Sequence, residues 1–115
     1  MRRSVLLALA VLLGPLAASA QDPDAADRAW RDGDTATAER LYAAILAADS
    51  THYAALHRMA LLRAWAEDYD ASLALFDRML RLYPEATDAR IDRARVLAWR
   101  GDLDRAVAAL QDVLA

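Results

Sequence analysis

The side chains that could perform chemistry are few, and their spacing does not assemble a recognisable site. The two histidines, His52 and His57, are five residues apart. On a helix that separation places them roughly 140° apart around the axis, so they cannot share one metal ion without ligands from elsewhere. The acidic pairs at 22/24, 32/34 and 68/70 lack the spacing and terminal glutamate of a calcium loop, and helix capping or a solvated face explains them better.

Nucleophiles and phosphate-binding loops are equally poorly supported. After residue 20, serine occurs only at Ser50 and Ser72, and Ser72 occupies a position where a repeated pattern elsewhere in the chain has alanine. No glycine-rich phosphate loop is found. We therefore predict that the protein is not an enzyme and that it uses no metal and no cofactor.

The aromatic and small residues follow a regular interval. Trp65 and Trp99 are 34 residues apart, and the same interval relates five further sets of positions. These sets are Ala26, Ala60 and Ala94; Asp34, Asp68 and Asp102; Ala38, Ser72 and Ala106; Tyr42, Phe76 and Leu110; and Leu46, Leu80 and Leu114. A repeat of this length predicts a stacked array of helix pairs that contacts partner molecules.

Turn and cap residues divide the chain into six predicted helices. Asp22 and Asp34 are suited to capping helix starts, Gly33 and Gly101 to closing helices, and Pro84 to ending one. The segment 49–51 supplies candidate caps for the third helix. We expect helices at about 23–31, 35–48, 52–66, 69–82, 87–99 and 103–114, with turns near 33, 67 and 101 and no strand.

The repeated residues resemble the tetratricopeptide family. The middle repeat carries Ala60, Asp68-Tyr69, Ser72, Phe76 and Pro84, and the last repeat carries Ala94, Gly101-Asp102-Leu103, Ala106 and Leu110. The resemblance implies an all-α fold, an α-solenoid of antiparallel helix pairs with about 2.5 to 3 repeats. One domain would span residues 21–115, with repeats near 21–52, 53–86 and 87–115.

Packing gives a physical reason for the repeated residue types. Small side chains at Ala60 and Ala94 let paired helices approach, and Phe76 and Leu110 are expected to fill the space between repeats. Arg90 and Arg93 differ from this pattern, because they occupy positions that are usually large and apolar in the family. How the fifth helix packs is therefore left open.

The same resemblance implies a binding groove. Trp65 and Trp99 stand where the family often faces the concave groove that receives extended peptides, although packing as core residues is the alternative interpretation. We predict that at least one of them lines the groove. His57, Leu61, Asp92 and Arg95 lie on the same helices and would flank it. The partner would be a protein or peptide.

The first 20 residues have the composition of a secretory signal. Arg2 and Arg3 precede an apolar run, and Ala18-Ser19-Ala20 stands before the expected cleavage point. An uncleaved membrane anchor is the alternative, but the apolar run is shorter than the roughly 20 residues needed to span a bilayer. We expect export to the periplasm or the medium, with no stable membrane insertion after cleavage.

Composition limits the class of partner further. The chain has no cysteine, so it forms no disulfide, and its formal net charge is −3. Its basic residues are all arginine and are scattered among acidic residues, whereas non-specific nucleic-acid binding needs a basic surface. Nucleic acid is therefore not an expected partner.

Two functions fit these observations. The first is an exported protein-interaction scaffold or adaptor that binds a partner segment through the repeat groove. The second is the repeat domain, or a fragment, of a larger envelope assembly, polysaccharide-export or outer-membrane protein, because the segment 94–102, ARVLAWRGD, resembles the periplasmic repeats of YaiO-like proteins. The helix at 103–114 has no polar capping helix after it, so we expect it to expose apolar surface and to support self-association.

Overall fold

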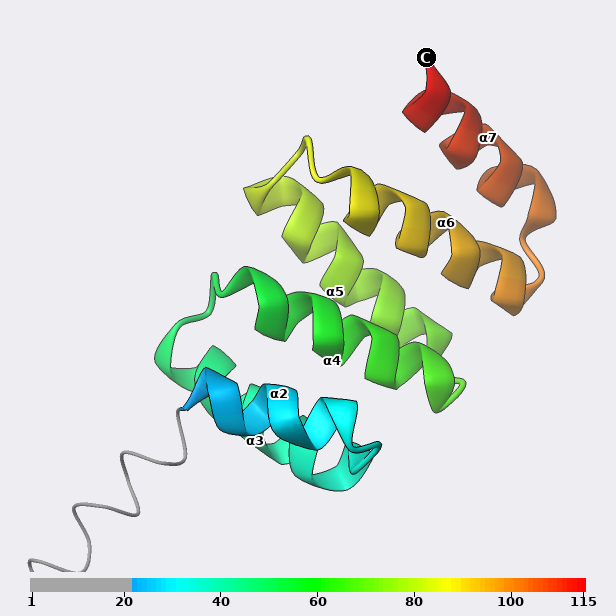
Figure 1. The fold of residues 1–115 in the computed structure, drawn as a ribbon. Coiled ribbons are helices and arrows are strands. Elements are labelled where there is room, and N and C mark those ends of the chain that lie inside the picture. Colours follow the sequence, from blue (N-terminus) through cyan, green and yellow to red (C-terminus); the bar gives the residue numbers. More distant parts are fainter. Residues whose placement is uncertain (1–21) are drawn as a thin grey trace, which may run out of the picture. The chain divides into compact units, whose positions relative to one another are not determined.

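The computed structural model describes residues 22–115, and every regular element within them is an α-helix (Figure 1). The helices are α2 (Pro23–Arg31), α3 (Thr35–Ala48), α4 (Tyr53–Trp65), α5 (Tyr69–Leu82), α6 (Thr87–Arg100) and α7 (Leu103–Leu114). The expected all-α helical-repeat fold is thus confirmed, and the expected bounds differ by one residue at the ends of α4 and at the end of α6. The predicted signal segment, residues 1–20, lies outside the described residues.

The chain divides into two compact units, one ending at Ser50 and one beginning at Thr51. In the first unit, α2 and α3 form a helical hairpin around Tyr42, which is fully buried. The ring of Trp30 meets the Tyr42 ring edge to face, with 6.5 Å between centroids. The Tyr42 hydroxyl donates a hydrogen bond to the carboxylate of Asp27. A buried phenol needs such a partner, so this bond lets the aromatic body pack without leaving a polar atom unsatisfied.

In the second unit, α4 to α7 pack each against the next in chain order (Figure 1). Large apolar side chains such as Leu56, Phe76 and Met79 are fully buried there. The helices α4 and α5 approach closely at Ala60, where Ser72 Oγ donates a 2.7 Å hydrogen bond to the Ala60 carbonyl. This bond explains how serine replaces the alanine of the other repeats: the site is fully buried, but the hydroxyl has an acceptor.

Three turns close helices α2, α4 and α6 with the same backbone hydrogen bonds. Gly33, Glu67 and Gly101 have φ angles of 75°, 62° and 100°, and they are 34 residues apart. The N–H of each bonds the carbonyl three residues earlier, and the N–H of the following aspartate bonds the carbonyl five residues earlier. This is the Schellman pattern, which satisfies the last carbonyls of a helix. The three turns therefore share one backbone hydrogen-bond pattern even where Glu67 replaces glycine.

The aspartate after each turn begins the next helix, but the three do not act alike. Asp34 accepts a hydrogen bond from the Thr37 N–H and Asp68 from the Ala71 N–H. The Asp102 carboxylate makes no capping bond and instead accepts from the Arg100 guanidinium. In the pair with Arg100 both partners are ionised and two guanidinium nitrogens donate, whereas in a cap bond only the carboxylate is ionised. This difference accounts for the exchange of partners.

The cap of α4 differs from the sequence expectation. We expected residues 49–51 to supply it, but His52 does so: its Nδ1 accepts a 3.2 Å hydrogen bond from the Ala55 N–H. The expectation was wrong because it considered only hydroxyl and carboxylate acceptors, whereas a neutral imidazole nitrogen can accept the same bond.

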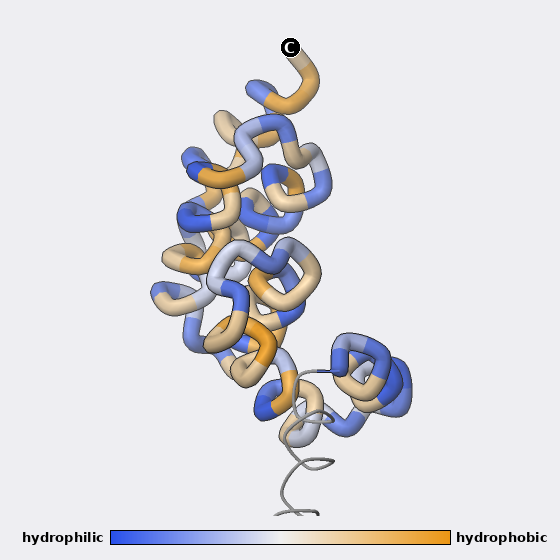
Figure 2. The backbone as a smooth tube through the Cα atoms, turned by 90° about the vertical axis from the view of Figure 1, so that its left-hand side faces the viewer, coloured by the Kyte–Doolittle hydropathy of each residue, from blue (hydrophilic) through white to orange (hydrophobic). Residues whose placement is uncertain are grey.

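The outer face of α7 is apolar and exposed, and Figure 2 shows that hydrophobic residues continue into this last helix. Leu103, Val107, Leu110 and Leu114 follow steps of four, three and four residues, so they share one stripe. Leu110 was expected to fill a gap between repeats, but 40% of it is exposed. Its counterpart Phe76 is fully buried because α5 packs against both α4 and α6.

Candidate functional site

The six residues predicted to flank the groove lie on α4 and α6 in two helical stripes. On α4 they follow steps of four, and on α6 steps of three and four, which keeps each set on one face. The α4 stripe is His57, Leu61 and Trp65, and the α6 stripe is Asp92, Arg95 and Trp99. We call these six residues the α4/α6 stripes.

The two tryptophans end their stripes as exposed side chains. Trp65 is 55% exposed and Trp99 is 45% exposed, each in the last turn or two of its helix. The interpretation of these side chains as core residues is contradicted by these fractions. An exposed indole offers a partner a large rigid apolar face, as many binding anchors do.

A polar cluster joins α4 to α6 at the other end of the stripes. The Nε2 of His57 lies 2.7 Å from Oδ2 of Asp92, and Arg95 Nη1 donates to the second Asp92 oxygen at 3.0 Å. The side chains of His57 and Asp92 are each less than one fifth exposed. Because a carboxylate only accepts, Nε2 of His57 carries the proton in this contact. The cluster therefore fixes the orientation of Arg95, whose side chain is more than half exposed.

Two further residues extend this cluster, and sequence reasoning missed both. The Tyr53 hydroxyl on α4 donates a hydrogen bond to Asp88 on α6, and the Nδ1 of His57 lies 3.7 Å from Oδ2 of Asp88. The bond from Tyr53 holds the pKa of the Asp88 carboxyl below its usual value. Partial burial, together with the bond to Asp88, raises the pKa of Tyr53 well above its usual value. Both groups thus keep the charge states that the hydrogen bond requires over a wide pH range.

A sequence signal for these contacts does exist. Tyr53 and Asp88 are 35 residues apart, and so are His57 and Asp92. The offset is one repeat plus one residue, so it joins equivalent helices of successive repeats. A search for complementary polar pairs at that separation would have found both.

Aromatic contacts hold the rings of Tyr53 and His57 in place. The Tyr53 ring meets Tyr83 edge to face at 5.1 Å, and the Tyr83 hydroxyl donates to the Thr51 carbonyl. The His57 ring meets buried Phe76 at 5.9 Å. The polar cluster therefore rests on side chains of α5 and on the segment before α4, which restricts the rotamers of Tyr53 and His57.

The α4/α6 stripes combine polar and apolar side chains. Within residues 22–115, no group of three or more His, Cys, Asp or Glu side chains is placed to hold a metal ion. In the same residues, no helix is both long and apolar enough to cross a bilayer. The α4/α6 stripes offer the Arg95 guanidinium in the middle of the α6 stripe and an exposed indole at the end of each stripe. This combination suits a ligand with both apolar and hydrogen-bonding groups.

Comparison with known proteins agrees with this architecture. Residues 64–115 match a family model described as tetratricopeptide repeat, which covers the end of α4 and the whole of α5, α6 and α7. No curated protein matches the chain. The match includes Trp65, Phe76 and the α6 stripe but not His57. Together with the 34-residue period and the paired helices, this match is consistent with an all-α, tetratricopeptide-like helical repeat.

Proposed function

We propose that the chain is an exported scaffold or adaptor that binds an extended segment of a partner protein along the α4/α6 stripes. Tetratricopeptide repeats generally mediate protein-protein interaction, and the match to their family model supports this class. The observation that carries the proposal is the exposure of Trp65 and Trp99 at equivalent positions of successive repeats.

The partner segment would need two kinds of group. Apolar side chains would stack on the indoles, because burying an aromatic face is a main source of interface energy. Carbonyl or carboxylate oxygens would accept from Arg95, since one Asp92 contact leaves other guanidinium donors available. The partner is therefore a peptide segment that alternates apolar and accepting groups, and no nucleic acid or membrane takes part.

A photocrosslinking experiment tests where the partner binds. A photoreactive amino acid replaces Leu61 in the middle of the α4 stripe, and in a matched variant it replaces Leu82, an exposed leucine on α5. Illumination in envelope extract should give a discrete crosslinked species from position 61 and little from position 82. Equal crosslinking from both positions, or from neither, would remove the support for a groove on α4 and α6.

Export is the second part of the proposal and is tested separately. The signal-like composition of residues 1–20 supports it. Expression with a C-terminal tag, followed by fractionation and N-terminal mass determination, should find the chain in the periplasm or medium, beginning at Gln21. A cytoplasmic chain that retains Met1 would contradict export without affecting the proposed binding surface.

The exposed stripe of α7 favours a second candidate function. In this alternative the chain is the repeat domain, or a fragment, of a larger envelope assembly, polysaccharide-export or outer-membrane protein, and α7 packs against a following helix. The stripe equally supports self-association of the chain. Sequencing the reading frame beyond the codon for Ala115 tests whether the chain is part of a larger protein. Sedimentation of a Leu103→Gln/Val107→Gln variant, compared with the unchanged chain, tests self-association.

A further inference from the structure

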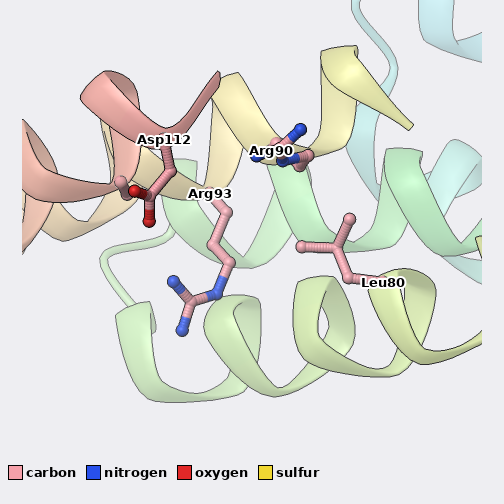
Figure 3. A pocket seen from close by; sticks show the side chains of 5 residues that line it. Leu80, Arg90, Arg93 and Asp112 are labelled. Carbon is pink, nitrogen blue, oxygen red and sulfur yellow. The ribbon is translucent and has the colours of Figure 1, made fainter. Parts of the chain in front are cut away.

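Side chains from helices α5, α6 and α7 line an open pocket of about 170 Å³ (Figure 3). Its lining residues are Leu80, Arg90, Arg93, Ala109 and Asp112. With 100° between successive residues, Arg90 and Arg93 lie opposite the α6 stripe on the helix surface. The pocket is therefore distinct from the proposed peptide groove.

The repeat explains why the space is open. One period earlier, the positions of Arg90 and Arg93 are Leu56 and Met59, which are buried at 0% and 7% exposure. Apolar side chains at these positions fill the space beside the next helix, whereas the two arginines keep their charged ends in contact with water. The last repeat thus has a pocket where the middle repeat has core.

The charged side chains that line the pocket differ in whether they have a partner. Arg93 Nε donates a 2.7 Å hydrogen bond to Oδ1 of Asp77 on α5, so its charge is compensated. In the described part of the chain, neither the Arg90 guanidinium nor the Asp112 carboxylate has a hydrogen bond or an ion pair. Figure 3 shows Arg93 and Asp112 directed into the same space, with Leu80 on its opposite side. The pocket therefore presents one available cation and one available anion beside an apolar wall.

We propose that this pocket binds a small zwitterion of the α-amino acid class. Its carboxylate would pair with Arg90, its ammonium group with Asp112, and a short aliphatic side chain would contact Leu80 and Ala109. A simple anion would meet repulsion from Asp112, and a simple cation would meet repulsion from Arg90, so a ligand with both charges fits best. A cavity of about 150 Å³ accommodates benzene, so a molecule with about six to nine heavy atoms matches the volume.

Calorimetric or NMR titration of the full chain with L-valine and L-leucine tests the proposal. Two analogues of leucine serve as comparisons: 4-methylpentanoate lacks the ammonium group, and 3-methylbutylamine lacks the carboxylate. We expect saturable binding of at least one amino acid, and at least about tenfold weaker binding of both analogues, because each loses a charge-assisted hydrogen bond. No saturable binding at millimolar concentration, or equal binding of the analogues, would overturn the proposal.

Substitutions then locate the binding. Arg90→Leu restores the residue type of the middle repeat, so it should fold, fill the pocket and abolish binding. Asp112→Asn keeps the size of the side chain and should weaken amino-acid binding about tenfold or more while sparing 4-methylpentanoate. Arg105→Gln, an exposed position on α7 outside the pocket, is the matched control and should bind as the unchanged chain does. Binding that survives both Arg90→Leu and Asp112→Asn would place the ligand elsewhere and refute the assignment.

Discussion

The Nε2 atom of His57 on α4 lies 2.7 Å from Oδ2 of Asp92 on α6, although the two residues are 35 positions apart. The contact bridges the two helices that carry Trp65 and Trp99, without involving the intervening α5 as a hydrogen-bond partner. It therefore helps to set the spacing of the α4/α6 stripes before any partner arrives. A surface that is organised in advance loses less conformational entropy on binding.

Removing either partner of this contact should destabilise the second unit. We expect His57→Ala and Asp92→Ala each to lower the free energy of unfolding by about 1 to 3 kcal/mol, because each removes one partner of a partly buried polar contact. The double variant should lose less than the sum, with a coupling energy of about 1 kcal/mol. Urea denaturation measures all four proteins, and strictly additive losses would show that the contact contributes nothing.

Tyr53→Phe should change the pH dependence of stability. The Asp88 carboxyl has a lowered folded pKa, so its contribution is present above its unfolded pKa of about 3.9 and is lost as pH falls through the lower folded value. Tyr53 has a raised folded pKa, so its contribution is present below about pH 10 and is lost as pH rises through the folded value. The difference in the free energy of unfolding between the unchanged chain and Tyr53→Phe should therefore be constant from about pH 5 to 9. It should decrease below and above that range.

The size of that difference should be small, about 0.5 kcal/mol, because the Asp88 side chain is more than half exposed and water screens the pair. Chemical denaturation across the pH range measures it. A difference that grows as pH falls below 4 would show that Asp88 is not the acceptor that matters.

Glu67→Gly should stabilise the chain. Glu67 has a φ of 62°, a region that side chains other than glycine rarely adopt, and the equivalent positions 33 and 101 are glycine. We expect a gain of about 1 kcal/mol, seen as a melting temperature several degrees higher. Gly101→Ala is the matched opposite: an added Cβ meets no atom within 4 Å there, so any loss reports backbone strain alone.

Phe76→Ala and Leu110→Ala should differ sharply although they occupy the same repeat position. Phe76 is fully buried, so its truncation should cost about 3 to 5 kcal/mol and unfold much of the second unit. Leu110 is 40% exposed, so its truncation should cost less than about 1 kcal/mol in the isolated chain. Circular dichroism melts compare them, and a large loss for Leu110→Ala would indicate that α7 is covered in solution.

Trp65→Ala and Trp99→Ala should separate binding from folding. Both side chains are substantially exposed, so the free energy of unfolding of each variant should lie within about 1 kcal/mol of that of the unchanged chain. The free energy of partner binding should weaken by about 2 kcal/mol or more. Acrylamide should quench both indoles readily. Leu82→Ala on α5 is a control for loss of exposed apolar area, and it should leave partner binding intact.

The local features of the fold were predictable because they depend on short-range chemistry. Asp22 and Asp34 cap helices as expected, and the turns at Gly33 and Gly101 require only a positive φ. Leu110 was mispredicted because burial depends on which helix lies across from it, and the repeat pattern is silent about that. The period places equivalent residues in register, but it does not say that every copy has the same neighbours.

The candidate site was likewise predicted only in part. His57, Asp92 and Arg95 were proposed through the family resemblance, and the structure brings these three together. Tyr53 and Asp88 were missed because only residues one period apart were compared, whereas this contact joins positions one period plus one residue apart. The pocket beside Arg90 was not predicted. The sequence showed only that Arg90 and Arg93 replace large apolar residues of the repeat pattern, and it does not show where long arginine side chains leave space.

Packing in chain order within α4 to α7 has a consequence for the speed of folding. Within this unit each helix packs mainly against a helix adjacent to it in the chain, so most loops that must close are short. Domains dominated by such local contacts typically fold in microseconds to milliseconds, and arrays of this kind can begin folding at any adjacent pair. Loss of structure should then proceed inward from α7, so amide exchange would be fastest there and slowest between α4 and α5.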